Sequence, residues 1–103
     1  MKSLFNLKEM MKKAQEMQEQ MRKELAETRV EGTSGGGMVT VVLDGTKNLI
    51  SIKIDPEVVK SGDIDMLQDL IIAAFNDAGV KVDQVMSEKL GSLGAGLKIP
   101  GLF

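Results

Sequence analysis

Residues 30–56 read VEGTSGGGMVTVVLDGTKNLISIKIDP, and this stretch decides the fold. β-Branched residues are frequent in it, and near its end apolar and polar side chains alternate so that Ile50, Ile52 and Ile54 share one face. The pattern predicts a three-stranded antiparallel meander with one buried face. We expect strands over residues 28–32, 38–44 and 49–54, joined by turns at residues 33–37 and 44–47.

A long helix is predicted before the meander. From Leu4 to about Glu27 the chain contains neither glycine nor proline, and apolar side chains recur at helical spacing. This amphipathic stripe consists of Leu4, Leu7, Met11, Ala14, Met21 and Leu25, widened by Met10 and Met17.

A second long helix is predicted after the meander. Asp55-Pro56-Glu57 is typical of a helix start and opens one turn, and Asp63 then caps a helix over about residues 65–90. The fold class is therefore α+β, with residues 1–90 as a single domain. Four glycines in residues 91–103 predict a flexible tail, although that tail carries the apolar residues Leu97, Ile99, Leu102 and Phe103.

The composition of the 103 residues excludes several classes of function. His, Cys, Tyr and Trp are all absent, which removes the commonest general base, the best nucleophile and the usual transition-metal ligands. We therefore expect no enzyme activity, no metal, no cofactor and no small-molecule substrate. Without cysteines, a signal-peptide pattern or an apolar run of roughly 20 residues, we expect a cytoplasmic protein that does not enter a membrane.

The helix lengths predict a homodimer. The two helices would measure about 36 and 39 Å, whereas a seven-residue strand spans only about 23 Å. Part of the apolar stripe therefore extends beyond the sheet, and the second face of the sheet is not fully polar. We expect a second copy to cover Met10, Met11, Val42 and Leu49. The alternative is a monomer whose two helices pack against each other beyond the sheet.

Positive charge is concentrated at the N-terminus. The first 13 residues hold four lysines, Lys2, Lys8, Lys12 and Lys13, against the single acid Glu9. One interpretation is a helix end that contacts DNA phosphates; the other is a solvated helix face, which the calculated pI near 5.1 favours.

Three further features have simpler structural explanations. Gly35-Gly36-Gly37 lacks the Gly-Lys-Ser/Thr of a phosphate-binding loop and leads into a strand, so a hairpin turn is expected. Asp63, Asp65 and Asp69 fall where a helix start attracts acids. The methionines of the first helix indicate core or dimer packing, with an adaptable groove for a partner protein as the alternative.

Taken together, the whole chain resembles the YbaB/EbfC nucleoid-associated proteins. The resemblance rests on the first helix rich in Met, Gln, Glu and Lys, on residues 30–41 and 54–56, and on residues 67–78. One departure is Gly79-Val80, where a continuous helix former would be more typical.

The resemblance implies a homodimer with tweezer-like helical arms that binds double-stranded DNA, associates with the nucleoid and has no enzyme activity. The DNA-binding candidates are chosen by position and charge: Lys2, Lys8, Lys12 and Lys13, with Lys89 and Lys98 near the end of the second helix. The alternative function is a protein-interaction adaptor that uses the methionine stripe or the apolar tail.

Overall fold

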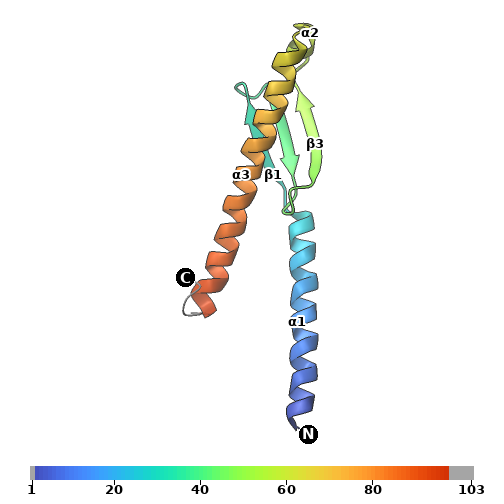
Figure 1. The fold of residues 1–103 in the computed structure, drawn as a ribbon, viewed down its shortest axis with the longest axis vertical. Helices are drawn as coiled ribbons and strands as arrows, with labels where there is room; N and C mark the ends of the chain where they lie inside the picture. Colours follow the sequence, from blue (N-terminus) through green and yellow to red (C-terminus); the bar gives the residue numbers. More distant parts are fainter. Residues whose placement is uncertain (1, 98–103) are drawn as a thin grey trace.

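The computed structural model describes the backbone of residues 2–97 and the side chains of residues 6–91. Its elements follow one another as a long helix, a three-stranded antiparallel sheet of order β1-β2-β3, a short helix and a second long helix (Figure 1). Their bounds are α1 Lys2–Glu27, β1 Val30–Ser34, β2 Val39–Leu43, β3 Leu49–Ile54, α2 Pro56–Lys60 and α3 Ile64–Leu97. The predicted α+β class and order of elements are confirmed.

The chain is strongly elongated. It measures 72 × 25 × 16 Å, and its radius of gyration is 20.1 Å, compared with about 13 Å for a compact domain of this length. The elongation arises because α1 and the end of α3 both project beyond the sheet in the same direction (Figure 1).

Several boundaries differ from the prediction. The first strand is Val30–Ser34, not 28–32, because Thr28 still belongs to the end of α1: its backbone N–H and its hydroxyl both donate to the carbonyl of Glu24. The turn into β2 accordingly starts at Gly35, where the three glycines take positive φ angles. The second strand, Val39–Leu43, is shorter by one residue at each end.

The long helix α3 is longer than predicted. It continues past the expected end at Leu90 through Gly91 to Leu97. A glycine inside a helix costs up to about 1 kcal/mol relative to alanine, but a helix that is already formed can extend through it. Residues 98–103 of the predicted tail lie outside the described residues.

The core lies between the sheet and α3. From β2, the side chains Val39, Val41 and Leu43 are fully buried, and they pack against a stripe of small and branched residues on α3. That stripe follows the predicted one and contains Ala74, Ala78 and Val82 at its buried centre, with Leu67, Leu70, Ile71, Val85 and Met86 half-buried around it.

The helix α3 covers only part of the sheet, which corrects one prediction. Its extensive contacts are with β1 and β2, and of β3 only Ile54 is half-buried against the core. Ile52 pairs with the buried Val41 and so shares its face, yet it is 40% exposed, and Ile50 is 46% exposed. The predicted buried face is therefore closed over β1 and β2 and at Ile54, and open at Ile50 and Ile52 of β3. A helix about 10 Å wide spans only about two strands at their spacing of about 4.8 Å.

Both α2 and α3 begin at the predicted caps. The Asp55 carboxylate accepts a hydrogen bond from the N–H of Glu57 at 2.9 Å, and the Asp63 carboxylate accepts one from the N–H of Met66 at 3.0 Å. The short helix α2 ends after one turn, as predicted, and only Val58 is buried on it.

The β2–β3 turn joins the sheet to α1. The buried Asp44 carboxylate accepts hydrogen bonds from the N–H and hydroxyl of Thr46 and from the N–H and amide of Asn48. The next residue, Gly45, donates its N–H to the carbonyl of Leu25 at 2.8 Å. This turn therefore fixes the point at which α1 leaves the sheet.

Asp44 makes the stability of this turn depend on pH. Burial raises the pKa of its carboxyl, but the hydrogen bonds from Asn48 and Thr46 outweigh burial, so the pKa lies below its ordinary value of 3.8. The charged carboxylate therefore stabilises the fold above that ordinary value, and this contribution is lost as the pH falls through the lowered pKa.

We expect Asp44→Asn to lower the melting temperature at neutral pH. The NH₂ group of the asparagine takes the place of one carboxylate oxygen and cannot accept the hydrogen bonds that this oxygen accepts. The difference from the wild type should shrink as the pH falls below 3.8. Thermal unfolding followed by circular dichroism across this range measures it. A difference that persists unchanged in acid contradicts the assignment.

Candidate nucleic-acid interface

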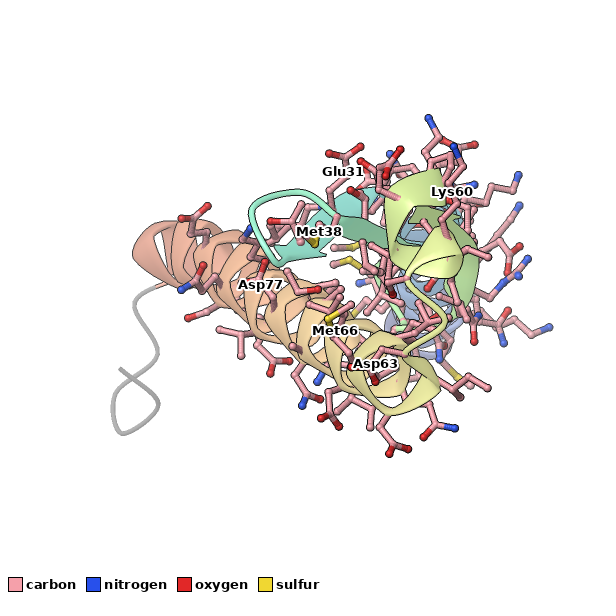
Figure 2. All side chains as sticks on the ribbon, turned by 90° about the horizontal axis from the view of Figure 1, so that it is seen from above. Glu31, Met38, Lys60, Asp63, Met66 and Asp77 are labelled. Carbon is pink, nitrogen blue, oxygen red and sulfur yellow. The ribbon has the colours of Figure 1, made fainter. Side chains whose placement is uncertain are left out.

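The projecting helix α1 is the most exposed part of the chain. Among the described side chains of α1, only those of Met21 and Leu25, near the sheet, are half-buried. Beyond its contact with the β2–β3 turn, α1 makes no extensive contact with another described element. Figure 2 looks down the long axis and shows α1 beneath the sheet, with α3 leaving to one side. The alternative in which the two helices of one chain pack together is therefore wrong.

Three of the predicted DNA-binding lysines lie on the part of α1 that is far from the sheet. Lys8 and Lys12 are one turn apart on the same side, Lys13 points about 100° away from Lys12, and all three are exposed. Lys2 belongs to the first turn of α1, but its side chain lies outside the described ones. This end of α1 therefore presents amino groups over an arc of about 140°.

These three lysines have no acidic partner among the described residues, whereas half of the other described cations do. Among the described side chains, four cations form ion pairs: Arg22 with Glu19, Lys47 with Asp83, Lys60 with Glu57, and Lys81 with Asp77. Neither Lys8, Lys12 nor Lys13 lies within 4.0 Å of a described carboxylate. Their charge is therefore available to an external anion.

The pair nearest to the sheet on α1 shows the contrast. Hydrogen bonding from Arg22, followed by its charge, lowers the pKa of Glu19, and the same interactions with Glu19 raise the pKa of Arg22. This pair is neutral as a unit. Residues 14–27 hold four glutamates against Arg22 and Lys23, so the net positive charge of α1 lies in its first half.

The other two candidates lie on or beyond α3. Lys89 is half-buried and makes no ion pair with a described residue. It lies past Asp83, whose ion pair of 2.9 Å with Lys47 marks where α3 passes the β2–β3 turn. The helices α1 and α3 are not in extensive contact and diverge from the sheet (Figure 1), so one chain does not bring Lys89 to the other lysines. Lys98 lies outside the described residues.

The charge pattern of the sequence missed three further cations without a described acidic partner: Lys23, Arg29 and Lys53. Lys53 pairs with Thr40 across the sheet and so lies on the face opposite α3. Arg29 donates to the backbone carbonyls of Ala26 and Thr28 at the end of α1. Of the three, only Lys53 had a signal in the sequence, because the predicted alternation of β3 places its side chain away from the core.

The predicted dimer-interface residues lie in three separate places. Met10 and Met11 are exposed on α1, by 67% and 58%. Val42 is half-buried on the outer face of the sheet, and Leu49 is half-exposed at the start of β3. The outer face around Val42 is otherwise polar, with Glu31, Thr33, Thr40, Ser51 and Lys53 on it.

A larger apolar surface lies on the inner face, where β3 is left open. We call it the β3 trough: Ile50 and Ile52 of β3 with Phe75 of α3, all between 40% and 46% exposed. Asp77 accepts a hydrogen bond from the N–H of Thr33 in β1, so its side of α3 faces β1 (Figure 2). Phe75, two residues away on the helix, points to the other side, toward β3.

Asp77 fixes this orientation of α3. The hydrogen bond from Thr33, followed by the one from Lys81, lowers the pKa of its carboxyl below the ordinary value.

Ile50 and Ile52 were predicted to lie in the core, because the alternation of apolar and polar residues shows which side chains share a face of the sheet. It does not show how many strands a helix covers.

Three further features of the described residues concern other kinds of site. The described residues contain no group of three or more acids, histidines or cysteines placed to hold a metal ion. No described helix combines the length and the apolar character that crossing a lipid bilayer requires. The three-glycine turn connects two strands, as predicted.

Comparison with known proteins identifies relatives along almost the whole chain. Residues 1–97 match the model of the YbaB/EbfC DNA-binding family. A nucleoid-associated protein of Koribacter versatilis is 53% identical over 97 residues, which cover 94% of this chain and 96% of the relative. A nucleoid-associated protein of Caldanaerobacter subterraneus is 46% identical over 102 residues, covering 96% and 92%.

The fold also occurs in a solved structure. The crystal structure of an uncharacterized protein from Helicobacter pylori matches with a TM-score of 0.70 and 23% sequence identity, covering 84% of this chain and 91% of the other. At this identity the match shows a shared fold.

Proposed function

Because this chain belongs to the YbaB/EbfC DNA-binding family, which is not an enzyme family, we propose that it binds double-stranded DNA as a homodimer and associates with the bacterial nucleoid in the cytoplasm. Phosphate contacts supply most of the affinity and give little sequence preference. The DNA-binding residues are Lys8, Lys12 and Lys13 of α1, together with Lys2, Lys89 and Lys98.

One observation carries this proposal: the three described lysines at the far end of α1 have no acidic partner among the described residues, whereas Lys47, Lys60 and Lys81 of the body are paired. Unpaired amino groups on an exposed helix release condensed counterions when they meet phosphates. The whole chain carries a net charge of −2. Binding is therefore directed by where the charge lies, and not by its total.

The surface area supports the homodimer. The chain exposes 8001 Å², whereas a compact monomer of 11.2 kDa exposes roughly 5,700 Å². The excess is larger than the roughly 800 Å² that each partner buries in an interface of standard size. The β3 trough supplies an apolar centre for such an interface, and a two-fold axis presents two copies of α1 to one duplex.

A duplex titration at two salt concentrations tests the proposal. Affinity should fall at least about tenfold between about 50 and 200 mM salt, and the triple variant Lys8→Gln, Lys12→Gln, Lys13→Gln should bind at least about tenfold more weakly with a shallower salt dependence. Fluorescence anisotropy of a labelled duplex measures both.

The matched control is the triple variant Lys47→Gln, Lys60→Gln, Lys81→Gln. It removes the same charge from lysines that already form ion pairs, so we expect it to bind nearly as well as the wild type. Equal losses in the two variants contradict the assignment of the site to α1. No binding by the wild type at low salt contradicts the proposal as a whole.

A further inference from the structure

Three lysines of α1 lie in a line that reaches from the far end of the helix toward the sheet. At about 100° per residue, Lys8, Lys12 and Lys23 fall within an arc of about 60° on one side of α1. All three are exposed, and none has an acidic partner among the described residues. From Lys8 to Lys23 the helix rises by about 22 Å, which is the axial length of about six base pairs of DNA.

One acidic side chain interrupts this line. Glu19 lies within the same arc, between Lys12 and Lys23. Its two carboxylate oxygens accept hydrogen bonds from Nε and Nη2 of Arg22, the first at 3.2 Å. Both side chains are more than half exposed. The charge of Arg22 is therefore taken up within the chain, on a surface that is open to an external anion.

We propose that Glu19 limits the affinity of α1 for DNA, because it holds Arg22 and repels the phosphates that approach Lys23. The inference rests on the proposed DNA binding and adds a built-in restraint on the same surface. Hydrogen bonds from an arginine to both oxygens of a carboxylate are among the stronger ones in proteins. A phosphate that binds Arg22 must displace this carboxylate, so the new contact adds little affinity.

The repulsion from Glu19 acts near the sheet and not at the far end of α1. Exposed charges that are farther apart than about 8 Å are largely screened at physiological salt. The rise along the helix from Glu19 is about 6 Å to Lys23 and about 16 Å to Lys8. In line with this, hydrogen bonding and charge of Arg22 lower the pKa of Glu19 most, and the charge of Lys23 lowers it further. Glu19 therefore restrains the inner end of the line and leaves Lys8 unaffected.

Glu19→Gln tests the restraint, because it keeps the shape of the side chain and removes its charge. We expect the variant to bind a labelled DNA duplex at least about fivefold more tightly than the wild type at about 100 mM salt. The slope of affinity against salt should become steeper by about one phosphate contact, since Arg22 is set free. Fluorescence anisotropy measures both quantities.

The matched control is Glu24→Gln. It removes the same charge five residues further along α1, but Glu24 lies about 140° away around the helix and forms no ion pair with a described residue. We expect the affinity of this variant to stay within about twofold of the wild type, because the charge of Glu24 lies across the helix from the line of lysines.

Two further substitutions assign the effect to single residues. Adding Arg22→Gln to the Glu19→Gln chain removes the whole ion pair, which is neutral as a unit, so we expect the affinity to return to within about twofold of the wild type. Lys23→Gln in the wild type should weaken binding at least about threefold and reduce the salt slope by about one. All these positions are exposed, and the helical signal in circular dichroism shows that the chains remain folded.

Each other outcome overturns a stated part of the inference. Equal gains in the Glu19→Gln and Glu24→Gln chains show that only net charge matters, and no gain in the Glu19→Gln chain removes the restraint. A gain that persists after Arg22→Gln overturns the role of Arg22, and unchanged binding of Lys23→Gln overturns the role of Lys23.

The same titrations separate this inference from the proposed function. If the wild type binds and the triple variant of Lys8, Lys12 and Lys13 binds more weakly, while Glu19→Gln changes nothing, the restraint alone is overturned. If neither the wild type nor any variant binds the duplex at low salt, the proposed DNA binding is overturned as well.

Discussion

Gly32→Ala is expected to destabilise the folded chain by about 3 kcal/mol, at the upper end of the usual cost of overpacking. A methyl group at Gly32 would lie 2.2 Å from the backbone nitrogen of Ala78 and 2.3 Å from the carbonyl oxygen of Ala74. Both atoms belong to the backbone of α3, which cannot move aside as a flexible side chain can. The substitution therefore separates α3 from β1 and opens the core.

Urea unfolding followed by circular dichroism measures this loss. Gly91→Ala is the matched control: it makes the same chemical change in α3 at a position where nothing lies within 4 Å of the added methyl. Alanine there should stabilise the helix by up to about 1 kcal/mol. If Gly32→Ala unfolds at the same urea concentration as the wild type, the packing of β1 against α3 is contradicted.

Ile52→Asp is expected to weaken the dimer by at least about 100-fold, because it places an unpaired charge in an apolar interface. Ile52 lies in the β3 trough on the inner face of the sheet, 40% exposed in the single chain. DNA affinity should fall with it, since separate copies present one α1 at a time and lose the gain from linked binding.

Sedimentation velocity over a range of protein concentrations measures the effect. Ser51→Asp is the matched control, because the neighbouring Ser51 pairs with Val42 on the opposite, polar face. Ile50→Asp repeats the test at a second position of the trough, and the helical signal in circular dichroism shows that the chains remain folded. Folded variants that dimerise as tightly as the wild type contradict the role of the trough.

The sequence predicted the elements well because each has a local cause. The caps at Asp55 and Asp63, the alternation in β3 and the apolar spacing of α3 all act over a few residues, and all are present in the structure. The errors are at boundaries. The first strand was shifted by two residues because Thr28 bonds back to Glu24, a choice that neither residue type reveals.

The less predictable features depend on how elements pack. Nothing local indicates that α3 stops short of β3, so Ile50 and Ile52 were expected to be buried. Ion pairing of the lysines likewise depends on how the elements pack. Counting lysines singled out Lys8, Lys12 and Lys13, but it did not show that Lys47 and Lys81 are already paired, since Lys47 reaches Asp83 across 36 positions of the chain. The presence or absence of an acidic partner is therefore what separates the lysines of α1 from Lys47 and Lys81.

Sedimentation of the purified chain, alone and with a short DNA duplex at low salt, tests the central claim most directly. We predict a species of twice the chain mass without DNA, and a faster species that contains both the dimer and the duplex when DNA is added. A single-chain mass that the duplex leaves unchanged contradicts the account.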